Sequence, residues 1–150
     1  MIDLPTDLPA DLVPLSWLRG VWEGSGVIDY AVGDTTLRGE FTHRVSFSHD
    51  GTDALTYSAI AWLTGDGQGE NFDEGDPRRV PLVSEAGFWR LSRPLGDADA
   101  GPGLLPATAP APARTVDDVE ALRTSEDGFE VEASIVHSDG VCELYLGQVR

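Results

Sequence analysis

The sequence predicts an all-β protein, an antiparallel up-and-down meander that forms a β-barrel. Residues 37–48 and 129–136 alternate apolar and polar side chains, which is the period of a strand with one buried face. Glycine and proline together make 17 + 10 = 27 of the 150 residues, and this composition favours turns and strands over long helices. A chain of this length suits one domain.

The first fifteen residues are expected to form an N-terminal extension, with the barrel domain over residues 16–150. Prolines 5, 9 and 14 break any long helix in this extension. A short helical turn is expected over residues 9–18, where three leucines fall roughly on one side.

Six strands are expected, over residues 21–30, 37–48, 53–63, 83–91, 129–136 and 141–149. Tight turns at Gly51 and Gly140 separate neighbouring strands, because glycine tolerates a positive φ. Two loop insertions interrupt the meander, at about 64–83 and 93–127, and residues 92–115 are of low complexity. Thr115 and Asp118 have the spacing of a capping box, so residues 115–123 are expected to form a short strand or one helical turn.

Six strands rarely enclose a ligand, since ligand-holding barrels generally need about eight or more. An open sheet would leave the last strand, residues 141–149, with an unpaired edge. The sequence therefore predicts a barrel that is incomplete at its C-terminal end, or a last strand that pairs with a second copy as a homodimer.

Charge and cysteine content exclude several classes of function. The chain has 26 acidic and ten basic residues, a net charge of −16, and every basic residue is Arg. A site that depends on lysine is therefore absent, and neither a nucleic-acid nor a membrane partner is expected. One cysteine, no signal-peptide pattern and no long apolar run predict a cytoplasmic protein.

No catalytic residue and no metal site is predicted from the residues alone. His43, His49 and His137 lack the spacing of a metal motif, and each is interpreted first as a surface or turn histidine. The acidic run at 66–76 is interpreted as a solvated loop, and Cys142 as a small buried hydrophobic residue.

The pattern G-x-W-x-G-x-G opens the first expected strand, as Gly20, Trp22, Gly24 and Gly26. This motif resembles that of the nitrobindin family, whose members look like fatty-acid-binding proteins and form a barrel of about ten strands. Three further segments, residues 45–57, 84–90 and 129–147, are similar to later strands of that family. The resemblance covers most of residues 16–150.

The resemblance implies that Trp22 plugs the base of a closed barrel. Its pocket would be lined by Trp22, Phe41, Tyr57 and Phe129. A buried Trp22 predicts that Trp22→Ala lowers the free energy of unfolding by about 3–5 kcal/mol.

The resemblance also implies haem b as cofactor, nitric oxide binding and isomerisation of peroxynitrite to nitrate. The family's iron ligand is a histidine in its last strand, and none of the three histidines here matches that position, so loss of haem is one interpretation. The first alternative is a non-haem binder of an apolar small molecule or lipid. The second is an interaction module that binds no small ligand.

Overall fold

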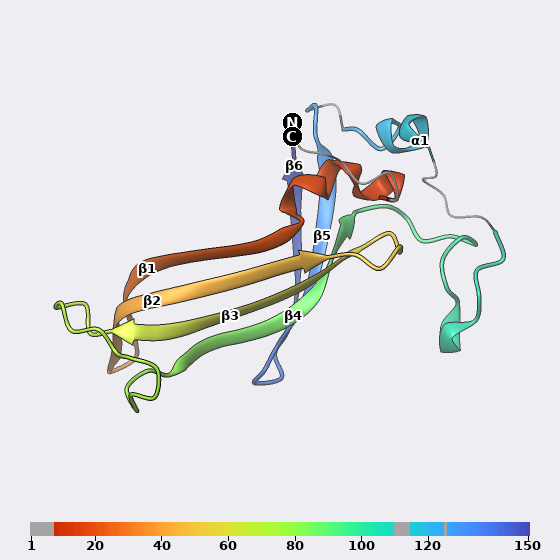
Figure 1. Cartoon of the computed structure of the whole chain (residues 1–150). Helices are drawn as coiled ribbons and strands as arrows, with labels where there is room; N and C mark the ends of the chain where they lie inside the picture. Colours follow the sequence, from red (N-terminus) through yellow and green to blue (C-terminus); the bar gives the residue numbers. More distant parts are fainter. Residues whose placement is uncertain (1–7, 110–114, 125) are drawn as a thin grey trace.

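A computed structural model describes residues 8–109, 115–124 and 126–150. They form one antiparallel sheet with the strand order β1-β2-β3-β4-β5-β6 (Figure 1). The strands are β1 (Gly20–Val32), β2 (Thr35–Ser48), β3 (Leu55–Gly65), β4 (Pro81–Leu91), β5 (Phe129–His137) and β6 (Cys142–Val149). The predicted all-β meander is therefore confirmed, and the six strands agree with expectation to within a few residues.

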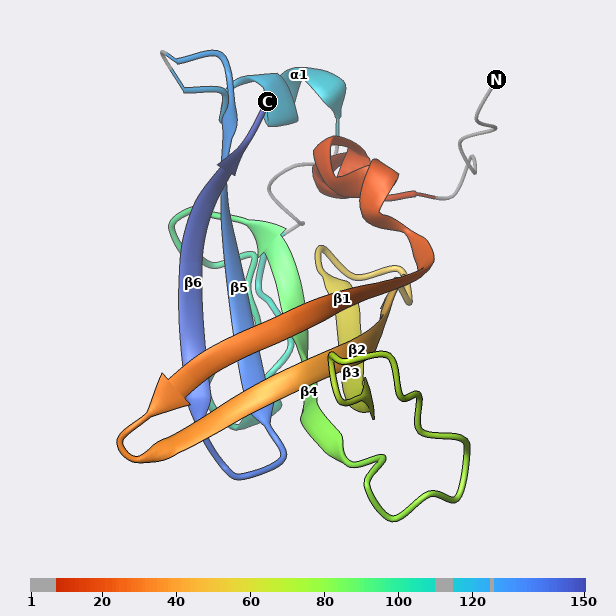
Figure 2. The same ribbon diagram turned by 90° about the vertical axis from the view of Figure 1, so that its left-hand side faces the viewer.

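The sheet curls into a half-barrel. In Figure 1, β1, β2 and β3 run at a steep angle to β5 and β6, and Figure 2 shows β1 and β2 running obliquely to β5 and β6. Gly87 permits a close approach of β4 to β5, because a Cβ placed there would lie 2.1 Å from the backbone oxygen of Ser134. Among the described residues β1 pairs only with β2 and β6 only with β5, so both are edge strands.

One face of the sheet, here called the inner face, carries the core. Residues paired across an antiparallel ladder share a face, and one such row runs Trp22, Val45, Ala59, Glu85, His137. The predicted alternation in β5 is confirmed. Its inner-face residues Phe129, Val131, Ala133 and Ile135 are all buried.

A 3₁₀ helix, η1 (Ala10–Leu18), covers one end of the inner face. Leu12 and Leu15 are fully buried against the sheet, so the predicted helical turn is confirmed and is part of the core. The helix α1 (Val116–Glu120) lies against η1, and the short η2 (Pro102–Leu104) precedes it. Thr115 and Asp118 form the expected capping box, which selects the helical alternative.

Hydrogen bonds and ion pairs hold the described residues of the two insertions. In the loop between β3 and β4, Gly65 makes an isolated bridge to Asn71. In the segment after β4, Arg93 pairs with Asp53 at 2.8 Å and with Asp99 at 2.6 Å.

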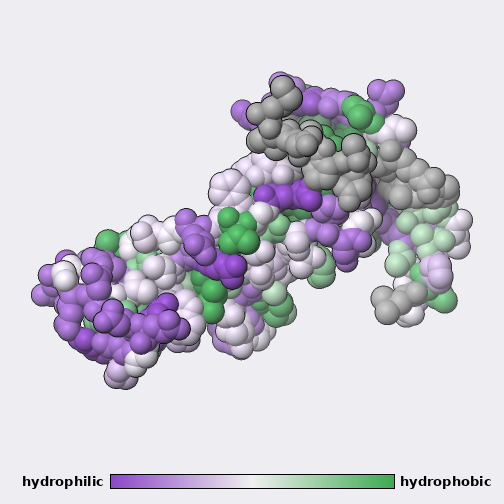
Figure 3. Space-filling model, viewed as in Figure 1, coloured by the Kyte–Doolittle hydropathy of each residue, from purple (hydrophilic) through white to green (hydrophobic). Residues whose placement is uncertain are grey.

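The sheet end that carries the β3–β4 loop is mostly hydrophilic (Figure 3). No helix among the described residues is long and apolar enough to cross a membrane.

Candidate functional site

The glycine–tryptophan motif lies on the inner face of β1. The Trp22 side chain stands opposite Val45, and its Nε1 donates a hydrogen bond to the Leu18 oxygen at 2.7 Å. Trp22 is nevertheless 52% exposed. Packing favours glycine at position 26, because a Cβ there would lie 2.9 Å from the Phe41 ring. The ring thus links η1 to β1, and the described residues do not enclose it as a plug.

The four predicted lining residues share the inner face but lie in different places. Tyr57 is buried in the centre of the sheet, while Trp22 and Phe41 lie on β1 and β2. Phe129 is buried near η1 and α1, where the Arg123 guanidinium lies 4.4 Å from its ring centroid. A single pocket lined by all four stays a prediction.

An aromatic cluster of Phe47, Tyr57 and Trp89 occupies the middle of the inner face, and Tyr57 is its one member among the predicted lining residues. The ring centroids of Phe47 and Tyr57 are 5.2 Å apart, and the edge-to-face pair of Phe47 and Trp89 is 5.6 Å apart. Phe47 lies on the same face as Val45, as the alternation predicted over residues 37–48 requires. The cluster makes a flat, apolar wall against which a ligand can pack.

A polar network borders this cluster and joins four strands. The Tyr57 hydroxyl donates to Glu85 at 2.5 Å, and His137 faces Glu85 at 3.4 Å and Glu143 at 2.8 Å. The Tyr145 hydroxyl donates to Glu143. No sequence motif predicted this network, because its members come from four different strands, β3, β4, β5 and β6.

Two tyrosine and carboxyl pairs in this network have shifted ionisation. Burial, followed by the hydrogen bond to Glu85, raises the pKa of Tyr57 above its ordinary value. Hydrogen bonds from Tyr145 and then His137 lower the pKa of Glu143. Tyr57 is therefore a neutral hydroxyl and Glu143 an ionised carboxylate at neutral pH.

The three histidines differ in what their ring nitrogens contact. His49 Nδ1 accepts the Gly51 N–H at 3.3 Å, in the turn where it was expected, and His137 is engaged at both nitrogens. His43 lies on the inner face between Gly24 and Ala61, and its Nε2 is buried without a hydrogen-bond partner in the described part of the chain. No group of three or more metal-binding side chains occurs among the residues described.

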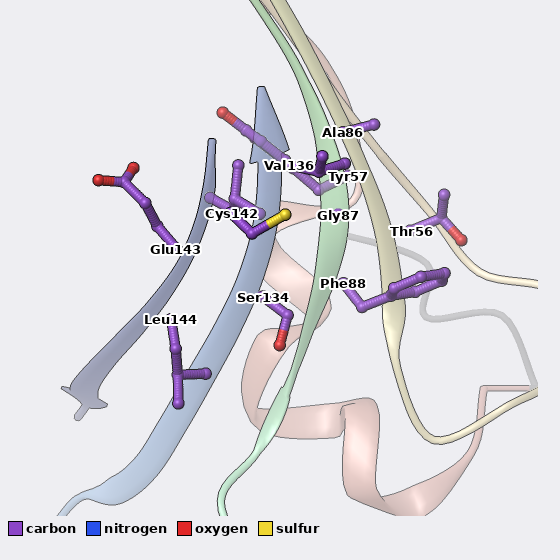
Figure 4. A pocket seen from close by; sticks show the side chains of 11 residues that line it. Thr56, Tyr57, Ala86, Gly87, Phe88, Ser134, Val136, Cys142, Glu143 and Leu144 are labelled. Carbon is purple, nitrogen blue, oxygen red and sulfur yellow. The ribbon is translucent and has the colours of Figure 1, made fainter. Parts of the chain in front are cut away.

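A hollow of about 570 Å³ opens where β3, β4, β5 and β6 meet (Figure 4). Exposed apolar side chains line it, including Phe88, Val136 and Leu144. The Glu143 carboxylate points away from the others. The expectation that Cys142 is buried was wrong, because this residue lies on an edge strand and is exposed.

The chain matches a known protein family and several known relatives. Residues 11–150 match the family described as THAP4-like, heme-binding beta-barrel domain. The chain is 55% identical over 150 residues to the peroxynitrite isomerase of Leifsonia xyli subsp. xyli, covering all of this chain and 70% of that protein.

Other relatives of the same name give the same picture. The peroxynitrite isomerase of Clavibacter michiganensis subsp. michiganensis is 54% identical over 150 residues, all of this chain and 70% of the relative. That of Pseudarthrobacter chlorophenolicus is 46% identical over 149 residues, 99% of this chain and 68% of the relative. The chain therefore belongs to the THAP4-like, heme-binding beta-barrel family, the nitrobindin family that its motifs resemble.

Proposed function

We propose that this protein binds haem b against the inner face of its sheet and isomerises peroxynitrite to nitrate. The observation that carries the proposal is the aromatic wall of Phe47, Tyr57 and Trp89 in a chain of a heme-binding barrel family. The names of the relatives support the reaction.

The inner face fits a porphyrin in two respects. Its aromatic wall suits a flat apolar ring, and His43 is the histidine whose buried ring nitrogen has no hydrogen-bond partner in the described part of the chain. We assign to His43 the contact that this chain would make to the haem. The carboxylates of Glu85 and Glu143 would repel the haem propionates, since like charges repel. The propionates would therefore lie away from these two residues. Bound haem would supply the ferric iron for the isomerisation.

A haemin titration followed by Soret absorbance tests this proposal. We expect a sharp, saturating shift at one haem per chain. His43→Ala should abolish or weaken saturation. His49→Ala is the matched control, because that histidine lies in a turn and should leave the titration unchanged. A broad response without saturation in the unsubstituted protein would contradict haem binding.

A second candidate function is binding of an apolar small molecule or lipid without haem. The apolar hollow beside Phe88 favours it, because about 570 Å³ lies within the size range of ligand pockets. Titration of delipidated protein with a fatty acid should then saturate. Phe88→Ala should weaken binding, while Val116→Ala, at an exposed site on α1, should not.

A third candidate is pairing of two copies through β6. Leu144 and Leu146 are exposed on this edge strand, and unpaired strand edges template pairing with another chain. Sedimentation velocity should show a dimer that Leu146→Lys converts to monomer, and a monomer at all concentrations would exclude this pairing.

The cytoplasmic location of the protein stays a prediction.

A further inference from the structure

An arginine on the outer face of the sheet has no carboxylate partner among the described residues. Seven other arginines among the described residues form ion pairs with acidic side chains. Arg79, just before β4, forms none, and its Nε is buried without a hydrogen-bond partner among the residues described. Arg19 also forms no ion pair among the described residues, but Arg79 alone among the described arginines has a buried Nε without a hydrogen-bond partner, in a chain with 26 acidic residues.

Arg79 borders a hollow of about 530 Å³ on the outer face of β1, β2 and β3. The hollow is also lined by Glu23, Ser25, Thr42, Arg44 and Trp62. Ser25 and Thr42 are cross-strand partners, so their side chains stand next to each other. The Arg79 guanidinium lies over the Trp62 ring, 5.5 Å from its centroid, which holds it at the rim by a cation–π contact.

The local charge is opposite to that of the molecule. Arg44 and Arg79 contribute +2 and Glu23 contributes −1, so the lining carries +1, whereas the whole chain carries −16. Arg44 and Glu23 pair at 3.2 Å, but both side chains are mostly exposed. Such a surface pair is weak, and Arg44 can turn to a competing anion.

We propose that this hollow is a binding site for a small molecule that carries an oxyanion, a phosphate or carboxylate, on a flat ring. The planar guanidinium of Arg79 offers paired donors that match an oxyanion, and the hydroxyls of Ser25 and Thr42 can donate to it. The Trp62 ring gives the flat part of the ligand an apolar surface. The site lies on the opposite face from the proposed haem, so either proposal can be wrong while the other holds.

Isothermal titration at constant ionic strength, with inorganic phosphate and with phenyl phosphate, tests the site. We expect saturable binding of both, with phenyl phosphate about tenfold tighter because its ring adds contact area. Arg79→Gln should weaken phenyl phosphate binding about tenfold or more, the size of a charge-assisted hydrogen bond. Arg79→Lys should retain part of the affinity, because lysine keeps the positive charge. It should not retain all of it, because lysine lacks the paired N–H donors of the guanidinium.

Arg38→Gln is the matched control. Arg38 is also on the outer face and pairs with Asp29 at 3.5 Å, but it is more exposed than Arg79 and lies outside the hollow. It should change the affinity by less than about twofold, as expected of a screened charge at a distance. Equal losses in both variants, with unchanged thermal unfolding, would overturn the site in favour of a general charge effect. Absence of saturable heat would also overturn it.

Discussion

Trp22 stands in the centre of the β1 motif, yet this residue is 52% exposed. The ring contacts η1 through its hydrogen bond to Leu18. We now expect Trp22→Ala to cost about 1–2 kcal/mol, well below the value for a buried tryptophan, because only half of its surface leaves water on folding. Urea unfolding measures the loss, with Trp17→Ala, an equally exposed tryptophan outside the motif, as the control. A loss above about 3 kcal/mol would show that the ring is enclosed.

Asp99 carries a pH-dependent contribution to stability. Its hydrogen bonds from Arg93, and then from the Gly96 N–H, lower its pKa to about 2. A lowered folded-state pKa stabilises the protein above the unfolded value near 3.9 and loses that effect as pH falls toward 2.

We therefore expect Asp99→Asn to cost about 1 kcal/mol at pH 7, a discounted value for a surface ion pair. The difference from the unsubstituted protein should shrink between pH 4 and pH 2. Thermal unfolding across this range checks it. A difference independent of pH would show that the effect is not electrostatic.

At the scale of elements, η1 is held by two leucines that are almost completely buried. Leu15 is 1% exposed, while Val13 on the same helix is 45% exposed. Leu15→Ala should lower the free energy of unfolding by about 2–4 kcal/mol, the cost of a core cavity. Val13→Ala should cost less than about 1 kcal/mol. Denaturant unfolding of both variants compares them, and equal losses would show that η1 does not dock as described.

The strands could be predicted from sequence because their signals are local. The alternation in β5 and the turn glycines 51 and 140 each lie within one short stretch. The Thr115 capping box is local as well, although the pattern left strand and helix open until the structure showed α1.

The arrangement of the site could not be predicted, because it depends on contacts between distant residues. Glu85 and His137 are 52 positions apart in the chain and meet only when β4 pairs with β5. Arg79 comes over Trp62 only when the β3–β4 loop folds back. The exposure of Cys142 depends on β6 being an edge strand.

At the scale of the whole molecule, the two faces of the curled sheet carry different chemistry. The inner face combines an apolar aromatic wall with the Glu85–His137–Glu143 network. The outer face carries the Arg79 hollow and the apolar hollow beside Phe88. This separation means that a ligand on one face need not compete with a ligand on the other.

We propose that the inner face supports haem-dependent isomerisation of peroxynitrite. The most direct measurement is the stopped-flow decay of peroxynitrite, with nitrate quantified, in the presence of haem-loaded protein, haem-free protein and free haemin. We predict that decay accelerates in proportion to haem-loaded protein and gives nitrate, while haem-free protein has no effect. A decay rate no faster with the haem-loaded protein than with free haemin at the same concentration would show that the protein does not catalyse this isomerisation.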